Sequence, residues 1–138
     1  MQLDDIYYSL TMSSGKVLKT NTHAGYHYII ISYGTHPCAY VDLPKKHPWY
    51  ELKYDEIPVK CHGGLTYSEK NDKFWRIGWD YAHCDDYSPL YFNSPENFKK
   101  WTVEEIVKEC ESVCNQAYRV ANEAIEYSCC NEIVKSHK

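Results

Sequence analysis

The sequence predicts an α+β fold, in which a mostly antiparallel sheet is packed by a long C-terminal helix. Over the first two thirds of the chain, short segments rich in β-branched and aromatic residues alternate with turn-forming residues, a pattern typical of strands. The last third instead repeats apolar residues at helical spacing. Because 138 residues suit one compact domain, we expect a single domain over residues 1–138.

The strands are expected in segments that turn or loop residues separate. Residues 24–33 read AGYHYIIISY, which favours a buried strand, and the alternating residues 38–43 form its expected hairpin neighbour. Further strands are expected at 57–62 and 74–80, with turns at 13–16 and 69–73. The segments 44–56 and 87–100 each hold two prolines and many polar residues, so both are expected as surface loops.

The helix has a clear start signal. Thr102 and Glu105 follow Trp101 and form the T-x-x-E pattern of a capping box. The apolar residues that then recur at helical spacing are Val103, Ile106, Cys110, Val113, Cys114, Ala117, Val120 and Ala124. One apolar face implies a helix that packs on the sheet, with Cys110 and Cys114 as core residues.

Composition limits the class of protein. The net charge of −4 argues against a general nucleic-acid binder, which carries a basic stripe. The chain starts without a secretory signal, and no apolar run approaches membrane-spanning length. We therefore expect a cytoplasmic protein without membrane contact, in which the seven cysteines are thiols or metal ligands rather than disulfides.

A cluster of metal-binding residue types lies between residues 60 and 86. If strands 57–62 and 74–80 pair with their apolar faces on the helix, period-two alternation puts His62 and Asp80 on one outer face, near strand ends. A turn after Asp80 would fold His83 back toward it, and Gly63-Gly64 allows a sharp bend. Imidazoles and carboxylates suit zinc or another divalent transition metal. The predicted zinc ligands are His62, Asp80, His83 and Asp86, with Asp85 or Cys84 as alternatives to Asp86.

Two alternatives stay open for this cluster, because its spacing matches none of the standard zinc motifs. His62 with Asp80, or His83 with Asp86, would also serve as a general acid/base pair. The same residues would otherwise be ordinary polar contacts at strand ends, with Asp85 and Asp86 capping a turn.

The loop HPWYELKYDE (47–56) is expected to form an aromatic and acidic surface. Aromatic side chains supply buried area in an interface, and carboxylates complement a basic target, so this surface suits a protein partner. The residues assigned to it are Trp49, Tyr50, Glu51, Tyr54 and Asp55, beside Glu56. The alternative is a solvated loop whose aromatic side chains fold inward.

Three segments carry a resemblance to known proteins. They are H-G-G-L-T at residues 62–66, G-x-D-x-A-H-x-x-D at residues 78–86 and E-C-E at residues 109–111 of the helix. Over about residues 36–118 the chain resembles a family of small phage and prophage proteins of unknown function. Because phage proteins of this size often counter host defence, the resemblance implies an anti-CRISPR or similar inhibitor in the bacterial cytoplasm, built around a bound zinc.

Two functions from different classes follow. The first is a metal-binding phage accessory protein that inhibits a host defence component by binding it, with an RNA-guided nuclease as the example. The second is a small metal-dependent hydrolase acting on a nucleotide-like substrate, which needs an open coordination position and a pocket. The binding function is preferred over an enzyme, because no nucleophile or base stands out once the expected ligands are set aside.

Overall fold

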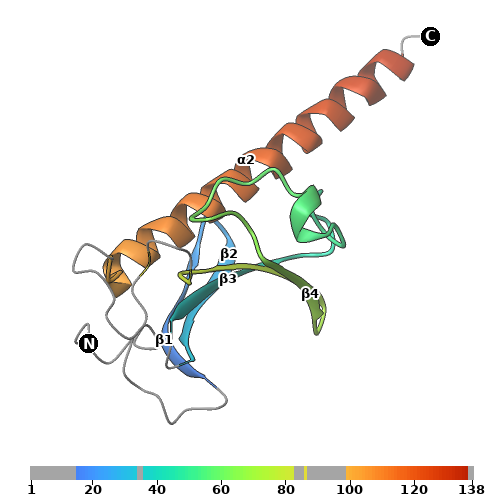
Figure 1. The fold of residues 1–138 in the computed structure, drawn as a ribbon. Coiled ribbons are helices and arrows are strands. Elements are labelled where there is room, and N and C mark those ends of the chain that lie inside the picture. The colour runs from blue at the N-terminus through green and yellow to red at the C-terminus, as the bar shows by residue number, and fades with distance from the viewer. Residues whose placement is uncertain (1–14, 34–35, 83–85, 87–98, 137–138) are drawn as a thin grey trace.

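The computed structural model describes residues 15–33, 36–82, 86 and 99–136, and the side chains of the last helix up to residue 125. A five-stranded antiparallel sheet packs against one long C-terminal helix, which confirms the predicted α+β fold (Figure 1). The order across the sheet is β1-β2-β3-β5-β4. The elements are β1 (Lys16–His23), β2 (Tyr26–Ser32), β3 (Pro37–Leu43), η1 (Tyr54–Glu56), β4 (Tyr67–Asn71), β5 (Phe74–Asp80) and α2 (Val103–Ser136).

The first hairpin explains where β2 begins. His23 pairs with Tyr26, so Ala24 and Gly25 form a two-residue turn with φ of 51° and 86°. Positive φ at both turn residues matches the right-handed twist of a hairpin, and glycine adopts it at no steric cost. The strand predicted at 24–33 is therefore confirmed as β2, which begins two residues later and ends one residue earlier. β1 was not predicted, because its mostly polar, exposed residues form an edge strand with little alternation.

The centre of the sheet follows the prediction closely. β3 covers the segment expected at 38–43, and β5 covers 74–80 over its full range. The turn expected at 69–73 is largely wrong, since residues 67–71 form β4 and only Asp72 and Lys73 turn the chain. The polar sequence of β4 hid it, because an edge strand does not need an apolar face.

The strand predicted at 57–62 is wrong. This segment has no strand pairing and instead runs along α2. The Lys60 backbone N–H donates to Gln116 Oε1 at 2.8 Å, and Gln116 Nε2 donates back to the Lys60 carbonyl at 2.8 Å. Side chains of the helix thus satisfy backbone groups that a neighbouring strand would otherwise bind, and sequence alternation does not distinguish the two arrangements.

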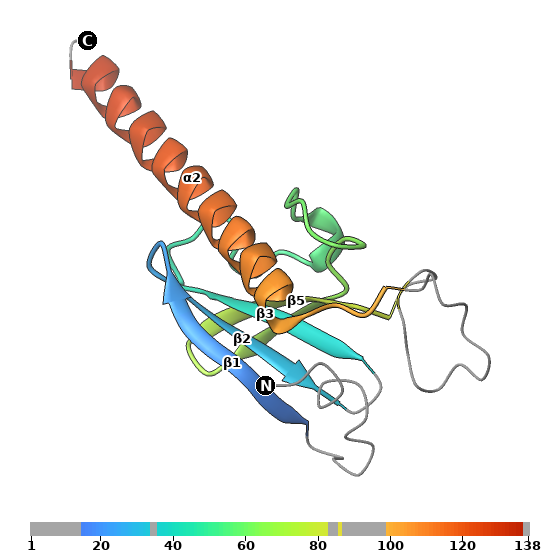
Figure 2. The same cartoon turned by 90° about the vertical axis from the view of Figure 1, so that its left-hand side faces the viewer.

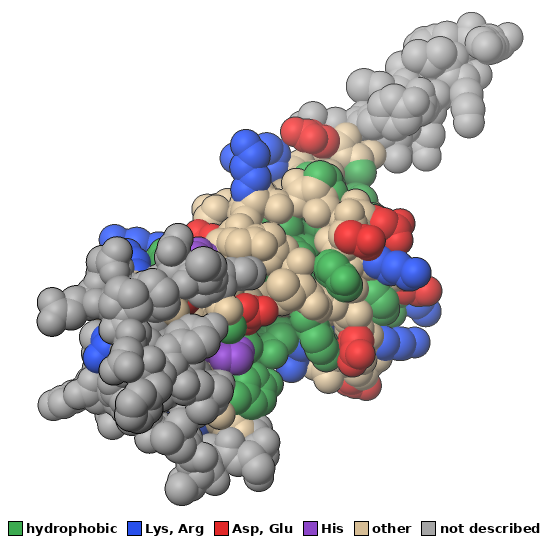
Figure 3. All heavy atoms as spheres, viewed as in Figure 1, with side chains coloured by type: hydrophobic (Ala, Val, Ile, Leu, Met, Phe, Trp, Pro, Cys, Tyr) green, Lys and Arg blue, Asp and Glu red, His purple; other side chains and the backbone are tan. Residues whose placement is uncertain are grey.

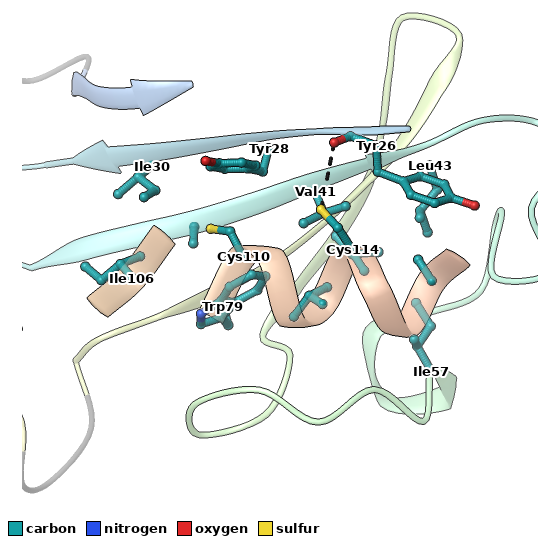
Figure 4. Packing of buried hydrophobic residues seen from close by; sticks show 14 of the residues in the cluster. Tyr26, Tyr28, Ile30, Val41, Leu43, Ile57, Trp79, Ile106, Cys110 and Cys114 are labelled. Carbon is teal, nitrogen blue, oxygen red and sulfur yellow. Dashed lines mark hydrogen bonds between the residues drawn. The ribbon is translucent and has the colours of Figure 1, made fainter. Parts of the chain in front are cut away.

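The core lies between the sheet and the first half of α2 (Figure 4). Alternate residues of β2, β3 and β5 point toward the helix, as the period of two requires. Cys110 and Cys114 are fully buried in the helix face, which confirms their predicted role in the core. Cys114 Sγ also donates to the Tyr26 carbonyl at 3.8 Å, so the helix is tied to β2 at this point.

The helix α2 crosses one face of the sheet and continues past it (Figure 2). Its 34 residues give a length of about 51 Å. Within the described ranges, no helix combines the length and the hydropathy needed to span a bilayer. The buried part of α2 ends near Ala117, and Tyr118 and Ile125 are exposed by 51% and 62%.

The predicted capping box at the start of α2 is confirmed. The Thr102 N–H donates to Glu105 Oε1 at 3.1 Å, and the Glu105 N–H donates to Thr102 Oγ1 at 3.2 Å. We expect Thr102→Ala to lower the free energy of unfolding by about 1 kcal/mol, because backbone donors of the first turn lose their acceptor. Thr102→Ser keeps the hydroxyl and is expected to stay close to wild type in urea denaturation; an equal loss in both variants would contradict a capping role.

Candidate functional site

His62 and Asp86 form a short side-chain hydrogen bond beside the first turns of α2. His62 Nε2 lies 2.7 Å from Asp86 Oδ2, and the side chains are 23% and 3% exposed. The His62 backbone N–H donates to Glu109 Oε1, so the helix fixes the turn that carries the imidazole. Cys61 and Gly64 close this turn by a backbone hydrogen bond of 3.0 Å.

Aromatic rings enclose the pair. The His62 ring stacks on Tyr81 with centroids 4.7 Å apart and planes 7° apart, and Trp101 packs against both rings. Trp101 Nε1 donates to Asp86 Oδ1 at 2.9 Å, so both carboxylate oxygens accept a hydrogen bond. Such an arrangement holds an imidazole in one orientation, as a carboxylate does beside metal-bound or catalytic histidines.

The predicted zinc ligands are only partly brought together. Asp80 precedes the buried Tyr81, which stacks on His62, so alternation puts Asp80 on the opposite face of the strand. The Asp80 carboxylate accepts from Thr66 Oγ1 at 2.9 Å and from the Ala82 N–H at 3.1 Å. The prediction that His62 and Asp80 share an outer face is therefore wrong. His83, Cys84 and Asp85 lie outside the described residues.

Metal binding stays a prediction. Among the described residues, no group of three or more His, Cys, Asp or Glu side chains is arranged to hold a metal ion. His62 and Asp86 meet directly, but further ligands would have to come from residues such as His83 that the structure does not describe.

The described thiols are poor nucleophiles. Burial raises the pKa of Cys38, Cys61 and Cys114 to about 12, and the Glu109 carboxylate adds to this effect at Cys61. Burial likewise raises the pKa of Cys110. Because the thiolate is the reactive form, these raised pKa values favour the protonated thiol near neutral pH, and Cys38, Cys110 and Cys114 are buried.

A second candidate site is the loop of residues 47–56, called here the acidic loop. The prediction that Trp49 belongs to its exposed surface is wrong, because Trp49 is 3% exposed and packs in the core. Tyr50 is half-buried, whereas Glu51, Tyr54 and Asp55 are exposed, with Tyr54 at 46%. The aromatic residues beside acidic ones in a polar loop favoured exposure, but the Trp49 side chain packs in the core cluster instead.

The acidic loop is anchored along its length. His47, also buried, contacts the Ala117 carbonyl through Nε2 at 2.8 Å. The Leu52 carbonyl accepts from Trp75 Nε1 at 2.8 Å, and the Tyr54 N–H donates to Ser68 Oγ at 2.8 Å. The loop is therefore fixed at four residues. His47 is bound to α2, Trp49 packs in the core, Leu52 is bound to β5 and Tyr54 is bound to β4. The exposed side chains between them are therefore held in a defined arrangement.

Within the acidic loop itself the exposed charged side chains are mainly negative, whereas Lys45 and Lys46 are exposed just before it. Glu51, Asp55 and Glu56 are exposed there with one exposed lysine, Lys53. Figure 3 shows acidic side chains, with lysines between them, over the side of the molecule where Figure 1 places η1 and β4. Tyr54 thus stands on an acidic surface that complements a basic one.

A polar cluster that the sequence did not reveal lies on the sheet face opposite α2. Arg76 donates to Asp42 through Nε at 2.8 Å and Nη2 at 3.0 Å, and His27 Nδ1 lies 3.3 Å from the same carboxylate. Asp42 and Arg76 are cross-strand partners on β3 and β5. Their separation in sequence hid the pair, and its bidentate geometry indicates a tie between strands.

Comparison of the chain with known protein families, with curated proteins and with solved structures finds no match.

Proposed function

We propose that this protein is an inhibitor that binds a component of a bacterial defence system, with an RNA-guided nuclease as the candidate partner, through the acidic loop. The observation that carries the proposal is the rigid display of Tyr54, 46% exposed, beside the exposed carboxylates of Asp55 and Glu56. Nucleases that hold RNA and DNA present basic surfaces, and such surfaces attract carboxylates. The sequence resemblance to small phage proteins supplies the choice of partner.

The anchoring of the loop supports a binding role. A loop that is already ordered loses little conformational entropy when a partner binds, so more of the contact energy appears as affinity. A partly exposed tyrosine supplies a large apolar contact with a hydroxyl at its end, the type of residue that dominates interfaces.

The test measures binding of the full chain to a purified RNA-guided nuclease loaded with guide RNA, by surface plasmon resonance. Asp55→Lys is expected to weaken binding about tenfold and to reduce its salt dependence, because an interface carboxylate becomes repulsive. Glu104→Lys is the matched control, since Glu104 is also exposed but lies at the start of α2. Equal affinities of both variants, or no binding by the wild-type chain, would contradict the proposal.

A second candidate function is a small metal-dependent hydrolase with a nucleotide-like substrate. One observation favours it, namely the 2.7 Å contact between His62 and the buried Asp86 carboxylate. In many zinc sites a carboxylate accepts a hydrogen bond from the metal-binding imidazole and fixes its orientation. It ranks second because it requires further ligands and a substrate pocket beyond the pair itself.

Zinc binding has its own test. If the predicted site forms, elemental analysis of the purified protein is expected to give about one zinc per chain, and His62→Ala with His83→Ala to give none. His27→Asn is a control, because it removes an imidazole on the opposite sheet face. Absence of metal from the wild-type protein would rule out the hydrolase in this form and leave the binding function standing without zinc.

A further inference from the structure

The hydrogen bonds of His47 fix its protonation. The Ala117 carbonyl only accepts and lies 2.8 Å from Nε2, so Nε2 carries the proton. The Trp49 backbone N–H only donates, and its nitrogen lies 3.0 Å from Nδ1, so Nδ1 is unprotonated and accepts the hydrogen bond. The two neighbours together are compatible with one form of the ring, the neutral Nε2–H tautomer.

We propose that His47 is the positioning residue of the acidic loop, that it holds the loop only in this neutral tautomer, and that acidification therefore releases the loop and weakens partner binding. The part on partner binding rests on the proposed function. The release of the loop follows from the hydrogen bonds of the His47 ring and does not depend on any partner. A proton on Nδ1 would face the Trp49 N–H at 3.0 Å and turn an attraction into a repulsion.

The contacts that the described residues make with the His47 ring come from backbone groups and aromatic rings rather than from carboxylates. His47 is 4% exposed, and the Tyr26 and Trp49 rings pack against it with centroids 5.6 and 4.9 Å away. The titratable groups on this side are Tyr26 on β2, Cys114 and Tyr118 on α2, and the exposed Lys45 and Lys46 of the preceding turn. Burial raises the pKa of Tyr26 and of Cys114, so neither of these two groups supplies a negative charge near neutral pH.

The direction of the pH effect follows from burial. Burial lowers the pKa of His47 from its ordinary value of 6.5, and the hydrogen bond to the Ala117 carbonyl opposes this only in part. The unfolded or released loop therefore takes up a proton before the folded loop does. The contribution of His47 is complete above pH 6.5 and is lost as the pH falls through the folded pKa.

The consequence reaches the exposed residues of the loop. The His47 carbonyl accepts from the Tyr50 N–H at 3.0 Å, and the Trp49 carbonyl accepts from the Leu52 N–H at 3.1 Å. Each turn of the acidic loop thus builds on the one before it, starting from the His47 ring. Loss of the hydrogen bond from the Trp49 N–H to the His47 ring therefore loosens the first turn of the loop, on which Glu51 and Tyr54 follow.

The first measurement needs no partner. NMR of the full chain with labelled histidine is expected to show the Nε2–H tautomer for His47 at pH 7.5 and a titration below pH 6.5. Across that titration, hydrogen-exchange protection factors of the Trp49 and Leu52 amides are expected to fall at least tenfold, while those of β2 and β3 change little. An Nδ1–H tautomer, a titration at or above 6.5, or unchanged protection would overturn the proposal.

The second measurement uses His47→Asn, because the asparagine oxygen accepts a hydrogen bond from the N–H two residues on and does not titrate. At pH 7.5 this variant is expected to bind the guide-loaded nuclease more weakly than wild type, because it loses the hydrogen bond to the Ala117 carbonyl, so the readout is the pH dependence of its affinity. Wild-type affinity should fall about tenfold for each pH unit below the folded pKa, whereas the variant stays level. His27→Asn, on the other sheet face, should keep the wild-type profile.

The outcomes separate the two proposals. A wild-type pH profile in His47→Asn would overturn the role of His47 while the proposed function stands. No nuclease binding at pH 7.5 would overturn the proposed function, and the NMR titration would then decide the role of His47 in the loop.

Discussion

Trp49→Ala is expected to lower the free energy of unfolding by about 3–5 kcal/mol, the cost of removing a large buried aromatic side chain from a core. Trp49 is 3% exposed and belongs to the cluster between the sheet and α2. Its removal takes away one of the four fixed points of the acidic loop and leaves a cavity. Thermal or urea unfolding followed by circular dichroism measures the effect directly.

The control for this change is Tyr54→Ala. Tyr54 is 46% exposed, so its truncation is expected to change the free energy of unfolding by no more than about 0.5 kcal/mol. Its effect should appear instead in partner binding, where an exposed tyrosine at the centre of an interface is worth about 2 kcal/mol. A large loss of stability in Tyr54→Ala with a small one in Trp49→Ala would reverse the assignment of these two rings.

Asp86→Ala should destabilise the protein by about 3 kcal/mol, because it leaves two hydrogen-bond donors without their acceptor in a part-buried site. Those donors are Trp101 Nε1 at 2.9 Å and His62 Nε2 at 2.7 Å. The carboxylate joins the segment after β5, the residues before α2 and the turn after Cys61. The indole fluorescence of Trp101 is expected to change in the folded variant as well.

Asp80→Ala serves as the matched control for Asp86. Asp80 accepts from Thr66 and Ala82 near the surface, so water replaces these contacts at a cost of about 1 kcal/mol. If Asp86→Ala and Asp80→Ala lower the free energy of unfolding equally, Asp86 is not the central hydrogen-bond acceptor of the cluster. Urea denaturation of both variants beside wild type makes the comparison.

The fold was predictable where the sequence pattern and the packing agree. β5 alternates Trp75, Ile77 and Trp79 toward the helix, and α2 begins with a capping box, so both were placed correctly. β1 and β4 are edge strands with polar, exposed residues, and their pairing comes from backbone hydrogen bonds that leave no apolar pattern. The segment 57–62 alternates like a strand, but Gln116 of α2 satisfies its backbone.

The candidate sites show the same limit. The prediction correctly put His62 and Asp86 in one cluster, yet the pair forms on the helix side, where Glu109 holds the His62 backbone. Of the five residues assigned to a partner surface, Trp49 lies in the core, because a sequence does not reveal the space beneath a loop. The role of His47 depends on Ala117, 70 residues away, so no local pattern announced it.

Hydrogen–deuterium exchange of the full chain, with and without the guide-loaded nuclease, tests most directly whether the acidic loop is the binding surface. Protection on complex formation is predicted for peptides that cover residues 51–56, with Glu104 and the start of α2 unchanged. Protection confined to other parts of the chain, with residues 51–56 exchanging at the rate of the free protein, would contradict it.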